Sequence, residues 1–199
     1  MLIGYEANNA LRYSGALGQF ARDLIELIAD AHVRDYRALL FSTRIKSEFR
    51  GYFSGHANVS TYLPSGSSRL LPEAWLRYRL NPILKEEKVK LFHGLNEELP
   101  YHIGREVKTV VTCYEVGQHR RGSLIDAMLW RKRMEYAFAS ADVVVAVSDR
   151  VRDQLLAMDV DEGKIEVIGV EGRPYEATRD MAERYFDLYR RLVGPQSAL

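Results

Sequence analysis

This chain has a single cysteine, a net charge close to zero and no long apolar run. The single thiol, Cys113, excludes an intrachain disulfide and a metal site built from several cysteines. It favours a reducing, cytoplasmic location. The net charge of +1 gives no overall attraction to nucleic acid, so no nucleic-acid partner is expected. No apolar run reaches the length of a membrane-spanning helix, and Met1–Glu6 reads as a strand where a signal peptide would be basic.

The composition that is present fits one globular domain. Hydrophobic residues make up 47% of the chain and charged residues 28%, which is ordinary for a protein with a packed core. A length of 199 residues suits one large domain. The sequence has no internal repeat and no low-complexity tract.

Short apolar runs alternate with helical patterns along the chain. Several of these runs are nearly continuous in Val, Ile and Leu, which is typical of parallel strands covered by helices on both faces. The expected strands are Leu2–Glu6, Arg37–Ser42, Val59–Leu63, Val89–Phe92, Lys108–Thr112, Val143–Val147 and Ile165–Ile168. The pattern predicts an α/β fold with a doubly wound, mostly parallel, Rossmann-like sheet.

Helical spacing of apolar residues predicts the covering layers. The expected helices are Leu17–Ala31, Pro72–Lys85 with an interruption near Pro82, Ser123–Ser140, a short helix after Ser148, and Met181–Val193. The last of these has a clean apolar stripe, so it must pack on something. We therefore expect a domain over residues 1–170, a connector over 171–180, and a C-terminal helix over 181–193 that closes the same domain.

Four segments at expected strand ends carry the candidate site residues, because the carboxyl ends of parallel strands line the binding crevice. The glycine turn contributes Gly15, Ala16, Leu17 and Gly18 before the first long helix, whose N-terminus favours an anion. Later strand ends contribute the cleft candidates His93, Gly94, Asn96 and Ser148, and the catalytic candidates Tyr114 and Glu115.

Simpler roles stay open for these residues. The glycines alone explain a tight turn from strand to helix. A lone histidine at a strand end, such as His93, is as often a structural hydrogen-bonding group as a ligand. Ser148 precedes a helix, where a hydroxyl that caps the first amides is a sufficient explanation. Cys113 reads as a small buried apolar residue.

In their order and spacing, these motifs resemble the N-terminal domain of a GT-B glycosyltransferase of the family 4 type. The resemblance implies that the glycine loop faces the donor's diphosphate and that the His-Gly pair borders the cleft. It also implies that the last helix is the one that returns from a C-terminal donor domain. Two departures stand out. Ala16 replaces the usual middle glycine, and Tyr114 and Glu115 stand where relatives have His-Asp. Tyrosine has a pKa near 10, so it cannot act as a neutral-pH imidazole.

The donor grip of such enzymes, an Arg and Lys pair with a Glu-x7-Glu motif, is missing from the C-terminal stretch. We therefore expect the acceptor-side half of a nucleotide-sugar transferase, truncated or engineered, with no turnover alone, no cofactor and no metal. The alternatives are a stand-alone Rossmann-like binding module and one chain of a split transferase.

The expected partners follow from the resemblance and from the surface. The resemblance implies a sugar or a lipid-linked acceptor. Basic residues with Trp75 and Tyr78 indicate either a solvated helix face or weak peripheral contact at the inner face of a membrane. A crevice left open by a missing domain would favour a two-fold homodimer. The residues expected to line that crevice are Leu17, His93, Leu95, Tyr114 and Val116.

Overall fold

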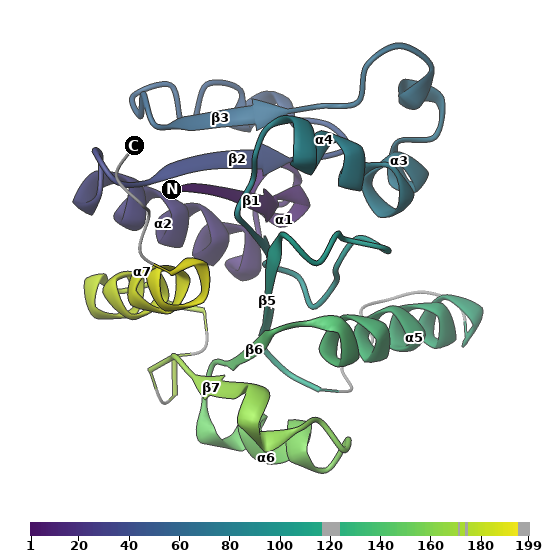
Figure 1. The fold of residues 1–199 in the computed structure, drawn as a ribbon, viewed down its shortest axis with the longest axis vertical. Helices are drawn as coiled ribbons and strands as arrows, with labels where there is room; N and C mark the ends of the chain where they lie inside the picture. The colour runs from purple at the N-terminus through teal and green to yellow at the C-terminus, as the bar shows by residue number, and fades with distance from the viewer. Residues whose placement is uncertain (117–123, 171, 174, 195–199) are drawn as a thin grey trace.

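The computed structural model describes residues 1–116, 124–170, 172–173 and 175–194. Within them, seven strands form one sheet in the order β3-β2-β1-β4-β5-β6-β7 (Figure 1). The strands are β1 (Leu2–Glu6), β2 (Arg37–Phe41), β3 (Val59–Tyr62), β4 (Leu91–Gly94), β5 (Lys108–Cys113), β6 (Val143–Ala146) and β7 (Ile165–Val167). All six neighbouring pairs are parallel. The predicted α/β fold class is therefore confirmed.

Seven α-helices and three short 3-10 helices accompany these strands in the described part of the chain, and all but α7 lie between two strands. The α-helices are α1 (Asn8–Arg12), α2 (Ala16–Ala31), α3 (Pro72–Tyr78), α4 (Leu80–Glu86), α5 (Leu124–Ser140), α6 (Asp149–Leu156) and α7 (Arg179–Val193). The 3-10 helices are η1 (Ser47–Phe49), η2 (Gly66–Leu70) and η3 (Glu162–Lys164). The helices α2 and α7 lie on one side of the sheet, and α3 and α5 lie on the other (Figure 1).

One local expectation was wrong, and another was shifted. The short helix α1 stands between β1 and the glycine turn, where the sequence indicated a direct turn. The predicted interruption of the helix over Pro72–Lys85 is present but lies at Arg79, between α3 and α4, three residues before Pro82. Pro82 instead lies in the first turn of α4, where a missing N–H costs no hydrogen bond.

The last helix, α7, packs beside α2 and over β4 (Figure 1). Its N-terminus is capped by Thr178, whose hydroxyl oxygen accepts from the Met181 amide at 3.3 Å. The predicted apolar stripe is buried, with Leu192 partly so. The stripe supplies much of the cover for the centre of the sheet.

A row of buried side chains, five with hydroxyl groups and one with an imidazole, is linked by hydrogen bonds across the contact between α7 and the sheet; we call it the hydroxyl chain. In order, its members are Tyr36, Tyr5, Tyr189, His93, Thr112 and Tyr185, and each is completely buried. Tyr36 donates to Tyr5 at 2.8 Å, and Tyr5 donates to Tyr189 at 3.3 Å. Beyond the imidazole, Thr112 and Tyr185 are joined at 3.0 Å. Buried polar groups need such partners, so the chain fixes where α7 sits.

The strand order reverses between β1 and β4. From β1 the chain moves outward through β2 to β3, then returns to the other side of β1 and continues outward from β4. In open parallel sheets, ligands bind at the carboxyl ends of the strands next to such a reversal. The residues that follow β1 and β4 therefore have the strongest claim to a binding role.

Candidate functional site

Glu6 ends β1 and is paired in register with Gly94, the last residue of β4. The two residues therefore lie on either side of the strand-order reversal. Beyond Glu6, the helix α1 places Asn8 and Arg12 over the ends of β1 and β2. Sequence reasoning missed all three polar residues.

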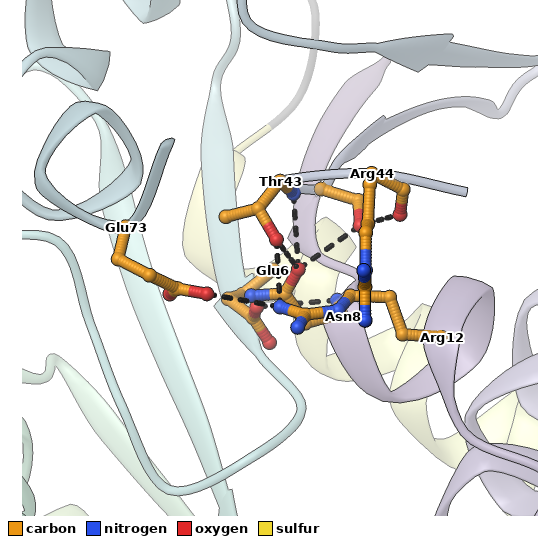
Figure 2. A network of polar contacts seen from close by, with 7 residues as sticks. Glu6, Asn8, Arg12, Thr43, Arg44 and Glu73 are labelled. Atoms are coloured by element: carbon orange, nitrogen blue, oxygen red, sulfur yellow. Dashed lines mark hydrogen bonds and ion pairs between the residues drawn. The ribbon is translucent and has the colours of Figure 1, made fainter. Parts of the chain in front are cut away.

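Glu6, Asn8, Arg12, Thr43 and Glu73 form a connected polar network (Figure 2). The Asn8 amide N–H donates to Glu6 Oε1 at 3.1 Å. Asn8 Oδ1 accepts from both the backbone N–H and the hydroxyl of Thr43, each at 3.0 Å. Arg12 Nη1 donates to Thr43 Oγ1 at 2.7 Å and to Glu73 Oε1 at 2.9 Å. The network ties α1, β2 and α3 together at one edge of the sheet.

Burial raises the pKa of Glu6 to about 8, and the negative charges of Glu98 and Glu73 act in the same direction. The Asn8 N–H and the Arg12 charge oppose the shift but do not cancel it. Glu6 is 3% exposed, and its Oε2 has no hydrogen-bond partner. At neutral pH this carboxyl group therefore keeps its proton and can donate a hydrogen bond.

The glycine turn lies where the sequence predicted it, at the start of α2. Gly15 is the N-cap of α2, and no side chain caps the first amides of the helix. Gly15 and Ala16 are exposed, and a Cβ at Gly15 would meet nothing within 4 Å. Leu17 is buried, and a Cβ at Gly18 would lie 2.0 Å from the Tyr13 carbonyl oxygen. Gly18 is thus needed for packing, while Gly15 leaves the helix N-terminus open.

His93 does not line an open cleft in this structure, so that expectation is corrected. The side chain is completely buried, with Nδ1 at 2.6 Å from the Tyr189 hydroxyl and Nε2 at 2.8 Å from Thr112 Oγ1. Burial lowers the pKa of His93 to about 3, so the ring is neutral. These contacts support a structural role for His93, as a hydrogen-bonding group inside the core.

The segment after β4 is held by a close backbone approach. A Cβ at Gly94 would lie 2.1 Å from the Glu98 carbonyl oxygen, so packing alone explains this glycine. Asn96 is half-buried, and its Oδ1 has no hydrogen-bond partner. Glu97 has a φ of +65°, which is uncommon outside glycine and clusters at functional sites. Its carboxylate accepts from the Tyr114 amide at 3.0 Å and so shapes the turn after β5.

Tyr114 and Glu115 differ in exposure. Tyr114 is buried between Phe20 and Tyr175, with ring centroids at 5.4 and 5.9 Å, and its hydroxyl has no partner. Burial raises the pKa of Tyr114 well above its usual value of 10, so it stays neutral. Glu115 is partly exposed and lies 3.8 Å from Arg150. Glu115 is therefore the more accessible of the two candidates.

Ser148 caps α6, since its Oγ accepts from the Val151 amide at 3.3 Å. The capping explanation therefore accounts for this residue. Burial also raises the pKa of the Cys113 thiol, in keeping with a buried apolar role.

The expected apolar crevice is filled within the chain itself. Leu17, His93, Leu95 and Tyr114 are all buried, and only Val116 is partly exposed. The proposed dimer face is therefore wrong, while dimerisation itself stays a prediction. A monomeric alternative, in which charged residues including Arg120 and Arg121 ring the crevice and keep it wet, falls in part outside the described residues, because both arginines lie there. In the described ranges, no group of three or more His, Cys, Asp or Glu side chains could hold a metal ion, and no helix could cross a membrane.

Solved structures resemble this chain over most of its length. HepE from Anabaena in complex with UDP-glucose has a TM-score of 0.54 at 14% identity, with 84% of this chain and 43% of that chain covered. A glycosyltransferase from Rickettsia africae has a TM-score of 0.50 at 16% identity, with coverage of 98% and 50%. The chain thus spans half or less of these two enzymes. Among curated proteins, none matches this sequence.

A third similar structure has the same extent as this chain. It is a sucrose-phosphate synthase chain from Thermosynechococcus elongatus, designated 27_220_406_426, with a TM-score of 0.54 and 14% identity. The match covers 98% of this chain and 100% of that one. At such identities the likeness concerns the fold.

The parallel sheet, the reversal between β1 and β4 and the closing helix α7 give this chain the Rossmann-like fold of one half of a GT-B glycosyltransferase. Residues 18–169 match the model of Glycosyltransferase Family 4, and the chain belongs to that family.

Proposed function

We propose that this chain is the acceptor-side half of a nucleotide-sugar glycosyltransferase, in a truncated or engineered form that has no turnover alone. The main support is the position of α7. It packs directly on the N-terminal sheet through a complete hydroxyl chain, although only a short connector separates it from β7. The similar sucrose-phosphate synthase chain is matched over 100% of its length by 98% of this chain.

The site supports an acceptor-side role through its unfilled polar groups. Glu6 ends β1, and Asn96 and Tyr114 follow β4 and β5; each of the three has a buried oxygen without a partner. Such groups favour a ligand or a water that supplies hydrogen bonds. The open N-terminus of α2 also suits a phosphate group, because helix amides favour an anion; Lys46 nearby is paired with Glu48 at 2.8 Å.

Transfer by this chain alone is not expected. Holding donor and acceptor in a reactive alignment supplies about 7–11 kcal/mol of barrier reduction. The C-terminal stretch of this chain has no Arg and Lys pair with a Glu-x7-Glu motif to hold a donor. Incubation with UDP-glucose and a panel of simple glycosides should give no product above background. Product formation that is lost in Glu115→Gln or Tyr114→Phe would overturn the proposal. Product formed only after a separate donor-domain chain is added would favour the split enzyme.

Weak peripheral contact with an anionic membrane is part of the same proposal. Leu70 and Leu71 are 82% and 70% exposed, and the exposed cations Arg69 and Arg79 lie near them in the sequence. Apolar side chains beside cations suit a negatively charged lipid surface. Sedimentation with vesicles of phosphatidylcholine, with or without phosphatidylglycerol, should show binding only to the anionic vesicles. If the double variant Leu70→Ser with Leu71→Ser binds anionic vesicles as well as the unchanged chain does, this contact is contradicted.

A further inference from the structure

Glu6 ends β1, one of the two strands that flank the strand-order reversal. Its polar network contains two buried atoms without a hydrogen-bond partner. Asn8 Oδ1 accepts from the hydroxyls of Ser42 and Thr43 and from the Thr43 amide, all at 3.0 Å. Arg12 uses Nη1 for Thr43 and Glu73. The buried atoms of this network that lack a partner are Glu6 Oε2 and Arg12 Nε.

These two atoms lie within one group of side chains (Figure 2). Glu6 and Arg12 are close enough for the guanidinium charge to act on the carboxyl group. One carboxyl oxygen is already fixed by the Asn8 amide, so the other has a set direction. A group that accepts from Arg12 Nε–H and also bonds Glu6 Oε2 would satisfy both.

The local charge selects what that group can be. Glu73 is paired with Arg12 at 2.9 Å, and Glu98 is paired with Arg133 at 3.0 Å. With Glu6 protonated, Glu6 and the two ion pairs carry no net charge, while Arg44, which is exposed, joins the network through its backbone carbonyl, the acceptor for Ser42 Oγ at 2.8 Å (Figure 2). An anionic ligand would find no unpaired cation among Glu6 and the two ion pairs, and burying an unpaired charge is costly. A hydroxyl group can both accept and donate without bringing a charge.

We propose that Glu6 and Arg12 form a specificity subsite for one hydroxyl group of an uncharged saccharide. Arg12 Nε–H and the protonated Glu6 Oε2–H both donate to the hydroxyl oxygen, which has two lone pairs to accept them. Glu6 acts here as a binding residue and takes no part in bond breaking. The inference rests on the proposed acceptor-side function, because it names the ligand class of that same site.

The test compares Glu6→Gln, Glu6→Ala and the control Glu86→Gln, which changes an exposed carboxylate at the end of α4. The probes are methyl α-D-glucopyranoside, methyl α-D-mannopyranoside and N-acetylglucosamine, with glucuronic acid as the anionic comparison. Ligand-observed NMR gives dissociation constants at pH 6.5 and 9. Amide shifts of Asn8 at pH 6.5 locate the site, and circular dichroism checks that each variant folds.

We expect one of the neutral probes to bind and to shift the Asn8 amide, while glucuronic acid does not. Glu6→Ala should weaken that binding about tenfold, which is the effect of losing one hydrogen bond to a buried group. Glu6→Gln keeps a neutral donor and should bind like the unchanged chain at pH 6.5. Binding to the unchanged chain should weaken between pH 6.5 and 9, since Glu6 ionises, while binding to Glu6→Gln should not.

Equal binding by Glu6→Ala, or the same pH dependence in Glu6→Gln, would overturn the subsite but leave the acceptor-side function standing. Binding without any shift at Asn8 would have the same meaning. If no neutral probe binds the unchanged chain at all, the two atoms are met by water only, and both the subsite and the acceptor-side proposal fail. The Glu86→Gln control should match the unchanged chain throughout.

Discussion

Removing the hydroxyl of Tyr189 tests the chain of hydroxyl groups that holds α7. The hydroxyl accepts from Tyr5 and donates to His93 Nδ1, so Tyr189→Phe leaves one buried donor and one buried acceptor without partners. A buried polar group left unsatisfied costs roughly 1–3 kcal/mol, so the expected loss is about 2–6 kcal/mol of unfolding free energy. For a domain of this size, that is a large part of the total stability.

Tyr36→Phe is the matched control, because Tyr36 is also completely buried but is the terminal member of the hydroxyl chain. Without the Tyr36 hydroxyl, the Tyr5 oxygen no longer accepts a hydrogen bond, but the Tyr5 hydroxyl still donates to Tyr189. The expected cost is about 0.5–1.5 kcal/mol, the value of one ordinary hydrogen bond. Urea unfolding followed by circular dichroism measures both variants. If Tyr189→Phe loses no more stability than Tyr36→Phe, the reasoning about orphaned groups is refuted.

The remaining predictions concern pH, packing and association. The unfolded chain protonates His93 below pH 6.5 and the folded chain only near pH 3, so stability falls as pH drops through that window. Folded Glu6 keeps its proton up to about pH 8 while the unfolded group loses it near 4.5, so stability also falls as pH rises between these values. Urea titrations should therefore give a maximum between about pH 4.5 and 6.5, and Glu6→Gln should remove the loss above it. Leu188→Ala in α7 should cost about 2–5 kcal/mol, and an unchanged urea midpoint would contradict that. Weak self-association stays a prediction for light scattering, but Leu95→Asp should unfold the chain, as circular dichroism would show, because Leu95 is fully buried.

Much of the fold could be predicted because its strands are buried on both faces and so read as apolar runs. The strand ends shifted by one or two residues, as in β4, which begins at Leu91 and not at Val89. The helix α1 escaped notice because five residues with two adjacent asparagines show no apolar period. Its existence depends on tertiary contacts such as those of Asn8 Oδ1.

The site was harder to predict because position along a strand does not tell which way a side chain points. His93 stands near a strand end, yet its ring points to the face that α7 covers. The available signal was the pair Tyr185 and Tyr189 in the apolar stripe of α7, because buried tyrosine hydroxyls need polar partners. Glu6 left no comparable signal, since a glutamate after an apolar run reads as the ordinary end of a strand.

The position of α7 has a consequence for the order of folding. Tyr189 and Tyr5 are 184 residues apart in the sequence, and His32 meets Glu183 across 151 residues. Closing such long loops is slow, because their entropy is lost before the contacts form. During synthesis α7 follows all seven strands, so Tyr5 and His93 lack their hydrogen-bond partner Tyr189 until α7 has been made. We therefore expect the incomplete chain to expose the apolar surface that α7 covers, and such surfaces favour aggregation or chaperone binding.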